Sequence, residues 1–218
     1  MAYTKAQMVE QVYLVISGGQ PTEDFDVQRE DIAMYLSNLI NTIALEDSRR
    51  NRLEARRDNI GSLGVDPSFL TVENFSVLSD TVSALKYIKF TKKPLLLDNS
   101  YGIAEVGPIQ GDSVFVKART KHDGVGLDYL FTGVTRWHFE NNQGEQRIYF
   151  RNIPISISSV RVAYVPSMDD MDDDDIVPLP SGMETLVVDR AVAFFQMEAD
   201  RPADDLINHK DDRNVKQQ

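Results

Sequence analysis

Two amphipathic helical patterns open the chain. Thr4 and Gln7 have the three-residue spacing of a capping box, in which side chains satisfy the free backbone N–H groups at a helix start. Apolar residues then recur at steps of three and four, first at Met8, Val9, Val12, Tyr13 and Ile16, and later at Ile32, Leu36, Leu39, Ile40 and Ile43. Gly18-Gly19 marks the end of the first helix. We therefore predict an antiparallel helix pair whose apolar faces meet.

The hydrophobic period changes from helical to alternating after the loop-like residues 61–67. Candidate strands follow at residues 70–77, 86–90, 103–106, 113–117, 134–140, 146–151 and 158–165. The clearest pair flanks residues 141–144 and is expected to form a hairpin with a longer turn. In the last strand, Val160, Val162 and Tyr164 share one face. This pattern predicts an antiparallel β barrel or sandwich inserted between helical segments.

A third helix is predicted near the end of the chain. Ser181 and Glu184 again have capping-box spacing, so the helix is expected to begin near Gly182. Its candidate buried or shared residues are Leu186, Val187, Val188, Ala191, Phe194 and Phe195. Apolar groups on nearly every side of a helix require burial, either within the domain or partly against another subunit. The pattern leaves both interpretations open.

These elements predict an α+β fold in which the third helix joins the N-terminal pair in a helical bundle. The expected organisation has an N-terminal helical part at residues 1–66 and an antiparallel β domain at 67–168. An acidic linker and the C-terminal helix follow at 169–200, packing on the N-terminal helices, with a tail at 201–218. With 218 residues, 42% of them hydrophobic, the chain can bury a real core.

Composition and motifs argue against several classes of function. The chain has no cysteine, and its three histidines, His122, His138 and His209, lie in different segments, so a transition-metal site is not expected. Phosphate-binding glycine loops and the G-x-S-x-G nucleophile motif are absent from the sequence. No apolar run approaches the length of a membrane helix. We therefore expect neither an enzyme nor a cofactor, and no membrane partner.

Charge is unevenly distributed along the chain. The net charge of −11 argues against general nucleic-acid binding, although an acidic surface would let DNA pass without adhering. The basic cluster comprises Arg49, Arg50, Arg52, Arg56 and Arg57. It is interpreted as a solvated helix end, with protein docking or DNA phosphate contact as alternatives. The six aspartates within residues 169–175 are interpreted as a solvated linker, with a divalent-cation site or a basic partner as alternatives.

Two further segments are candidates for contact with a partner. Residues 119–133 are rich in glycine and are expected to form a long excursion between strands, which can touch a neighbouring subunit. The tail at 201–218 is largely polar and would be mobile in isolation. Its apolar residues Leu206, Ile207 and Val215 are therefore predicted to anchor it to a partner.

The order of features from Asp172 to Phe195 resembles the end of head-to-tail connector (adaptor) proteins of tailed bacteriophages. That order is an acidic linker, Val177-Pro178-Leu179-Pro180, a polar capping residue, an acidic residue and an apolar helix. The resemblance implies a structural subunit of a ring, expected to be a dodecamer, joining the portal to the tail. It also implies contacts with the portal and other neck proteins, DNA passing through without specific binding, and a place in the virion neck after assembly in the host cytoplasm. A stopper, tail terminator or second neck ring is the nearest alternative, and a nucleic-acid-binding protein using the arginine cluster a more distant one.

Overall fold

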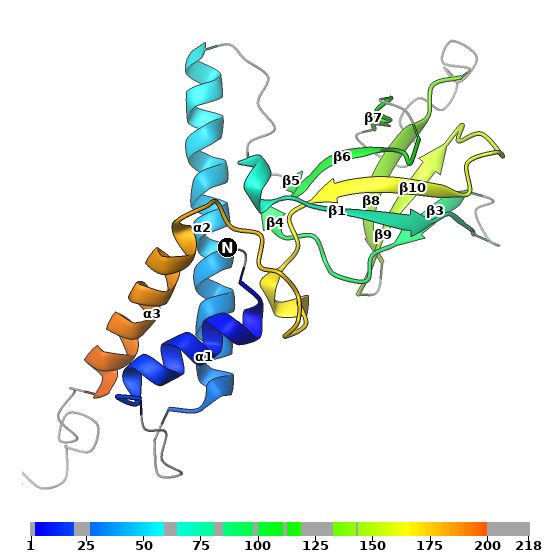
Figure 1. The fold of residues 1–218 in the computed structure, drawn as a ribbon. Helices are drawn as coiled ribbons and strands as arrows, with labels where there is room; N and C mark the ends of the chain where they lie inside the picture. Colours follow the sequence, from blue (N-terminus) through cyan, green and yellow to red (C-terminus); the bar gives the residue numbers. More distant parts are fainter. Residues whose placement is uncertain are drawn as a thin grey trace, which may run out of the picture.

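The protein has a mixed α+β fold. A computed structural model describes residues 3–19, 27–58, 65–80, 85–97, 100–110, 113–118, 133–142 and 144–199. Within these residues three helices gather on one side and the strands on the other (Figure 1). The segment between the last strand and the last helix runs back from the strands to the helices.

The first helix, α1 (Lys5–Ile16), has the predicted capping box. The Gln7 backbone N–H donates to Thr4 Oγ1 at 3.2 Å, and the Thr4 N–H donates to Gln7 Oε1 at 3.0 Å. Gly18 and Gly19 follow the helix with φ of +65° and +79°, a backbone region in which glycine carries no steric cost. The predicted start and end of this helix are therefore confirmed.

The second helix, α2 (Arg29–Asp58), continues beyond its apolar pattern through the arginine cluster, as the interpretation of the cluster as a helix end predicts. The third helix, α3 (Met183–Ala199), begins one residue later than expected. Its cap also differs, since Glu184 accepts the backbone N–H of Gly182 at 2.8 Å instead of that of Ser181. Gly182 has a φ of +90°, which explains why the chain turns into the helix at this glycine.

The three helices contact one another around a shared hydrophobic core. In Figure 1, α1 and α3 both lie against the same half of α2, and the other half of α2 extends past them. The buried side chains include Met8, Val12, Ile32, Leu36, Ile40, Val187, Ala191 and Phe195. Each helix contributes one stripe at helical spacing, as the periodicity predicts for α1 and α2.

The strands form separate sheets. Their bounds are β1 (Thr71–Ser76), β2 (Leu78–Ser79), β3 (Lys86–Lys89), β4 (Leu96–Leu97), β5 (Ser100–Tyr101), β6 (Ile103–Pro108), β7 (Val116–Lys117), β8 (Arg136–Asn142), β9 (Glu145–Arg151) and β10 (Ser159–Tyr164). One sheet has the order β1-β10-β6, a second has the order β2-β3-β9-β8-β7, and β4 pairs with β5. Short 3-10 helices, η1 (Pro67–Phe69) and η2 (Met168–Asp170), flank the β region.

The two larger sheets share one core. Val160, Val162 and Tyr164 on β10 are fully buried, so the predicted inward face of this strand is confirmed. Ile148 on β9 is also fully buried, and the indole N–H of Trp137 on β8 donates to the Phe115 carbonyl at 3.1 Å. The strands within the described residues form no closed barrel.

Two details of the predicted strands are wrong. The strand expected at residues 113–117 is reduced to β7, and it pairs parallel to β8 although an antiparallel domain was predicted. The β8–β9 hairpin is confirmed, but its strands continue to Asn142 and restart at Glu145. The connection is therefore two residues long and shorter than predicted. Gly144, within this connection, has a φ of +85°, the backbone conformation that tight hairpin turns require.

Candidate functional site

Residues 165–182, which we call the linker, join the β region to the helices. On the β side the linker is bonded to residues 93–102. The Ser167 N–H donates to the Lys93 carbonyl at 2.7 Å, and the Val165 N–H donates to the Gly102 carbonyl at 2.7 Å. Asp170 accepts the Lys93 backbone N–H at 3.0 Å and lies 3.5 Å from the Lys93 ammonium group. Backbone and charged contacts thus fix this end of the linker to the sheets.

On the helix side, the linker covers the start of α1. The first N–H groups of an α-helix have no partner within the helix. Here the Lys5 N–H donates to the Asp175 carbonyl at 3.1 Å, and the Ala6 N–H donates to the Asp173 carbonyl at 3.0 Å. The Lys5 ammonium group donates to the carbonyls of Met168 and Met171. The linker therefore supplies the acceptors that the N-terminus of α1 lacks.

The acidic run within the linker is largely exposed, as expected, but two of its carboxylates, Asp170 and Asp175, form ion pairs. Asp175 forms an ion pair of 2.6 Å with Lys92, and both side chains are mostly buried. Burial alone would raise the pKa of Asp175, but hydrogen bonds from Lys92 and the Asp172 N–H, with the charges of Lys92 and Lys5, lower it overall. Side chains of Asp172, Asp173 and Asp174 remain exposed. Among the described residues no group of His, Cys, Asp or Glu side chains is suited to hold a metal ion.

The sequence analysis did not identify Lys92 and Lys93 as partners of this run. The sequence does contain a hint of this pairing, because two adjacent lysines precede Pro94 and their positive charges complement the aspartates. The pairing was not predicted because about 80 residues separate the two segments. Only the return of the chain along β10 brings them together.

Replacing Lys92 by alanine is expected to lower the free energy of unfolding by about 1–2 kcal/mol, the usual range for losing a charged hydrogen bond at a mostly buried site. The pKa of Asp175 is lower in the folded state than in the unfolded chain. Its ion pair with Lys92 therefore contributes fully to stability at pH values above the unfolded-state pKa. The contribution is lost as the pH falls through the folded pKa. Urea denaturation at pH 7 and in the acid range should therefore show a difference between wild type and Lys92→Ala that shrinks on acidification.

Lys89→Ala is the matched control for this prediction. Lys89 forms an ion pair of the same kind with Glu145 at 2.7 Å, but both side chains are more exposed. Its removal should cost less than that of Lys92, because the pair is exposed and Glu145 keeps Arg147 as a second partner. An equal cost for the two variants at pH 7 would contradict the role assigned to the Lys92–Asp175 pair.

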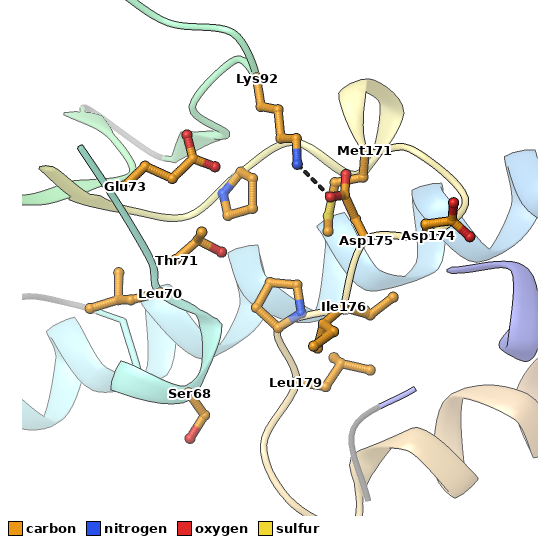
Figure 2. A pocket seen from close by; sticks show the side chains of 13 residues that line it. Ser68, Leu70, Thr71, Glu73, Lys92, Met171, Asp174, Asp175, Ile176 and Leu179 are labelled. Atoms are coloured by element: carbon orange, nitrogen blue, oxygen red, sulfur yellow. Dashed lines mark ion pairs between the residues drawn. The ribbon is translucent and has the colours of Figure 1, made fainter. Parts of the chain in front are cut away.

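A groove lies where β1, the linker and Lys92 meet (Figure 2). It has a volume of about 630 Å³. Its apolar lining comes from Leu70, Pro166, Met171, Ile176, Val177, Pro178 and Leu179. Figure 2 shows Glu73 and Thr71 on one wall, with Ile176 and Leu179 opposite. The sequence pattern had indicated no site here, because the lining residues come from three separate segments.

No protein-family model and no curated protein matches this sequence. The surfaces of the helices and the groove are therefore the features from which a function is inferred.

Helix α3 buries one stripe only, although its sequence is apolar on most sides. Val187, Ala191 and Phe195 are buried, and Val188 is partly buried. Leu186 and Phe194 remain substantially exposed. Phe194 stacks on Tyr35 of α2 with ring centroids 4.2 Å apart, so one of its faces is covered. The described chain thus leaves part of this helix without an intramolecular partner.

Other exposed apolar side chains lie near the same end of the helices. The C-terminal ends of α1 and α3 and the N-terminal end of α2 all point away from the sheets (Figure 1). We call the exposed apolar residues on these ends the distal surface: Leu14, Val15, Met34, Phe194 and Met197. Met34 is 64% exposed and Met197 is 67% exposed. Exposed apolar side chains on neighbouring helix ends are candidates for contact with a partner.

The arginine cluster is carried by the half of α2 that extends past the other helices. Arg49 and Arg50 are exposed, whereas Arg52 is partly buried. Burial and, second to it, the positive charge of Arg52 lower the pKa of Lys117 on β7. The side chains of Arg56 and Arg57 lie outside the described residues. Of the three described side chains of the cluster, two are thus exposed and one is partly buried.

Several predicted features cannot be placed. The tail residues Leu206, Ile207 and Val215 lie outside the described residues, as does the segment 119–132. His138 on β8 lies opposite Tyr149 of β9 in the ladder, on the other face of the sheet from Trp137, and its side chain is partly buried. None of the described helices is both long and apolar enough to cross a membrane.

Proposed function

We propose that this protein is an adaptor subunit of a tailed-bacteriophage neck, whose copies form a ring between the portal and the tail. The distal surface is the observation that supports this proposal. An isolated protein gains nothing from exposed Met34, Met197 and Val15 at one end of its helices, whereas a ring subunit would bury them against a neighbour. A ring of twelve would match the expected symmetry of the portal.

The proposed subunit is a three-helix bundle with an inserted β sandwich. The shared core of α1, α2 and α3 and the common core of the two larger sheets support this division. In the ring, the helical part and the tail would contact the portal or a neighbouring ring. The β region would contact the next component of the tail. Such contacts are repeated by symmetry, so each can be weak.

Net charge supports a passage role for the ring. At −11, the subunit repels a DNA duplex, so DNA would move past without specific binding. The proposed protein carries out no catalysis and needs no cofactor. Its place is the virion neck, after assembly in the host cytoplasm. A stopper, terminator or second neck ring would use the same kind of surface with a different neighbour.

Oligomer mass is the test of this proposal. The purified protein, alone and mixed with the portal of its phage, is expected to form rings that native mass spectrometry and electron microscopy detect. The double variant Met34→Glu/Met197→Glu should lose the oligomer, because each change places a charge in the interface. Both residues are exposed in the monomer, so its circular dichroism and melting temperature should change little.

Ile155→Glu is the control, since Ile155 is 93% exposed and lies in the β region, remote from the distal surface. This variant should keep the wild-type mass. A wild-type protein that remains monomeric both alone and beside the portal would refute the proposal.

A further inference from the structure

The groove between β1 and the linker has a net negative charge. Three carboxylates line it, those of Glu73, Asp174 and Asp175, together with a single cation, Lys92. The ammonium group of Lys92 is bound to Asp175 at 2.6 Å, so these two charges compensate each other. Within the part of the chain that the structure describes, neither Glu73 nor Asp174 forms an ion pair. Two negative charges of the groove are therefore left without a cation.

A buried hydroxyl group lies near one of these carboxylates. Tyr164 of β10 is fully buried, and its hydroxyl makes no hydrogen bond of normal length to the described residues. Tyr164 stands opposite Thr71 in the β1–β10 ladder, and Thr71 lines the groove. Burial, and after it the negative charge of Glu73, raises the pKa of Tyr164, so the phenol keeps its proton beside this carboxylate. Buried polar groups are usually bonded, so a polar ligand would complete this wall.

The rest of the groove is apolar. Leu70, Met171 and Leu179 contribute to its walls, and Ile176 is 61% exposed. Figure 2 shows Glu73 on the side of β1, with Ile176 and Leu179 across the groove. The volume of about 630 Å³ is in the range of sites that bind a small molecule or a few side chains. An arginine suits such a site, because its aliphatic stem packs on apolar walls while the guanidinium group pairs with a carboxylate.

Strand β1 favours an extended ligand. Within the described residues β1 pairs with β10 alone, so its other edge has free backbone groups. Thr71 and Glu73, two positions apart, share the face of β1 that borders the groove. In an extended segment lying along β1, side chains two positions apart would likewise share one face.

We propose that the groove binds an extended segment of a partner protein in which an arginine has aliphatic residues two positions away on either side. The guanidinium group pairs with Glu73, and the aliphatic side chains pack against the apolar walls. Asp174 adds attraction for the positive charge at the exposed side of the groove. Nucleic acid does not fit this chemistry, because the same carboxylates repel phosphate.

This interaction goes beyond the proposed ring and does not require it. The groove lies where the linker joins the β region to the helices, whereas the distal surface is at the opposite ends of the helices (Figure 1). A subunit could therefore bind a neighbour through the distal surface and a second protein through the groove. Loss of ring formation would leave the groove able to bind.

Peptides of defined charge test the proposal on the full-length protein. The probe is a rhodamine-labelled peptide, Val-Thr-Arg-Thr-Leu, compared by fluorescence anisotropy with the same peptide carrying glutamine or glutamate in place of arginine. We expect the arginine peptide to bind about tenfold more tightly than the glutamine peptide, and the glutamate peptide more weakly still. Added salt should reduce this preference, since the groove is open to solvent.

Variants of Glu73 locate the binding site. Glu73→Gln should abolish the preference for arginine, and Glu73→Arg should reverse it in favour of the glutamate peptide. Glu30→Gln and Glu30→Arg are matched controls, because they change the net charge equally on an exposed glutamate at the remote end of α2. If the Glu73 variants fail to fold, Asp174→Asn replaces an exposed groove carboxylate and should still weaken binding of the arginine peptide.

Three results would overturn the inference. The arginine and glutamate peptides would bind equally, or no peptide would bind at millimolar concentration, or the Glu30 variants would change the preference as much as the Glu73 variants. The mass of the wild-type oligomer tests the ring separately, so failure of either proposal leaves the other standing.

Discussion

Replacing Met168 by alanine is expected to lower the free energy of unfolding by about 2–5 kcal/mol, the range for truncating a buried methionine. The Met168 side chain is 2% exposed and belongs to the core that the helices share with the linker. Its backbone N–H donates to Asn41 of α2 at 3.1 Å, and alanine would keep that bond. The loss therefore reports the side chain's packing alone. Urea denaturation followed by far-ultraviolet circular dichroism measures it.

Ile176→Ala is the matched control in the same linker. Ile176 is exposed, so its truncation should change the free energy of unfolding by less than about 0.5 kcal/mol. A cost below about 1 kcal/mol for Met168→Ala would show that the helical core does not hold the linker, and would contradict the packing described above.

Truncation of Ile148 to alanine is expected to cost a similar amount, about 2–5 kcal/mol, but in the β core. Ile148 is fully buried between the two larger sheets. The single tryptophan, Trp137, lies in the same core, so its fluorescence reports unfolding of the sheets directly. The linker bonds both cores, so helix circular dichroism and Trp137 fluorescence should give the same urea midpoint, lowered equally by this substitution.

The exposed isoleucine Ile155 again offers a control of identical chemistry. Ile155→Ala should leave the midpoint within error of the wild type. If Ile148→Ala shifted the fluorescence transition while leaving the helical transition unchanged, the linker would not couple the two cores.

Local patterns predicted much of the secondary structure. The Thr4–Gln7 capping box and the stop at Gly18-Gly19 depend on interactions between residues close in sequence, and the inward face of β10 follows from its alternating pattern. The β8–β9 hairpin is local in the same sense, although its turn was predicted too long. The second half of helix α2 has a charged sequence that gives no apolar period, and its arginine cluster was interpreted as a helix end; the helix continues to Asp58. Charged helices can nevertheless continue through favourable side-chain spacing.

The candidate site was much less accessible to sequence reasoning. The acidic residues 169–175 stood out, but their partners Lys92, Lys93 and the start of α1 are distant in sequence. The groove is lined by segments around residues 68–73, 92 and 166–179. Only the last of these segments had a pattern that the sequence analysis singled out. Such sites form where distant segments of the chain meet, and a local hydrophobic period does not encode that meeting.

By itself, the sequence determined the α+β class, the helix start at Thr4 and the apolar stripes, because capping and periodicity act over a few residues. Only the tertiary structure decided which apolar face of α3 is buried. Val187 and Ala191 meet the other helices, whereas Leu186 and Met197 remain exposed. The tertiary structure also decided that the acidic run forms hydrogen bonds and ion pairs with distant residues. Both outcomes depend on distant segments meeting, since burial and ion pairing require neighbours that the local sequence does not supply.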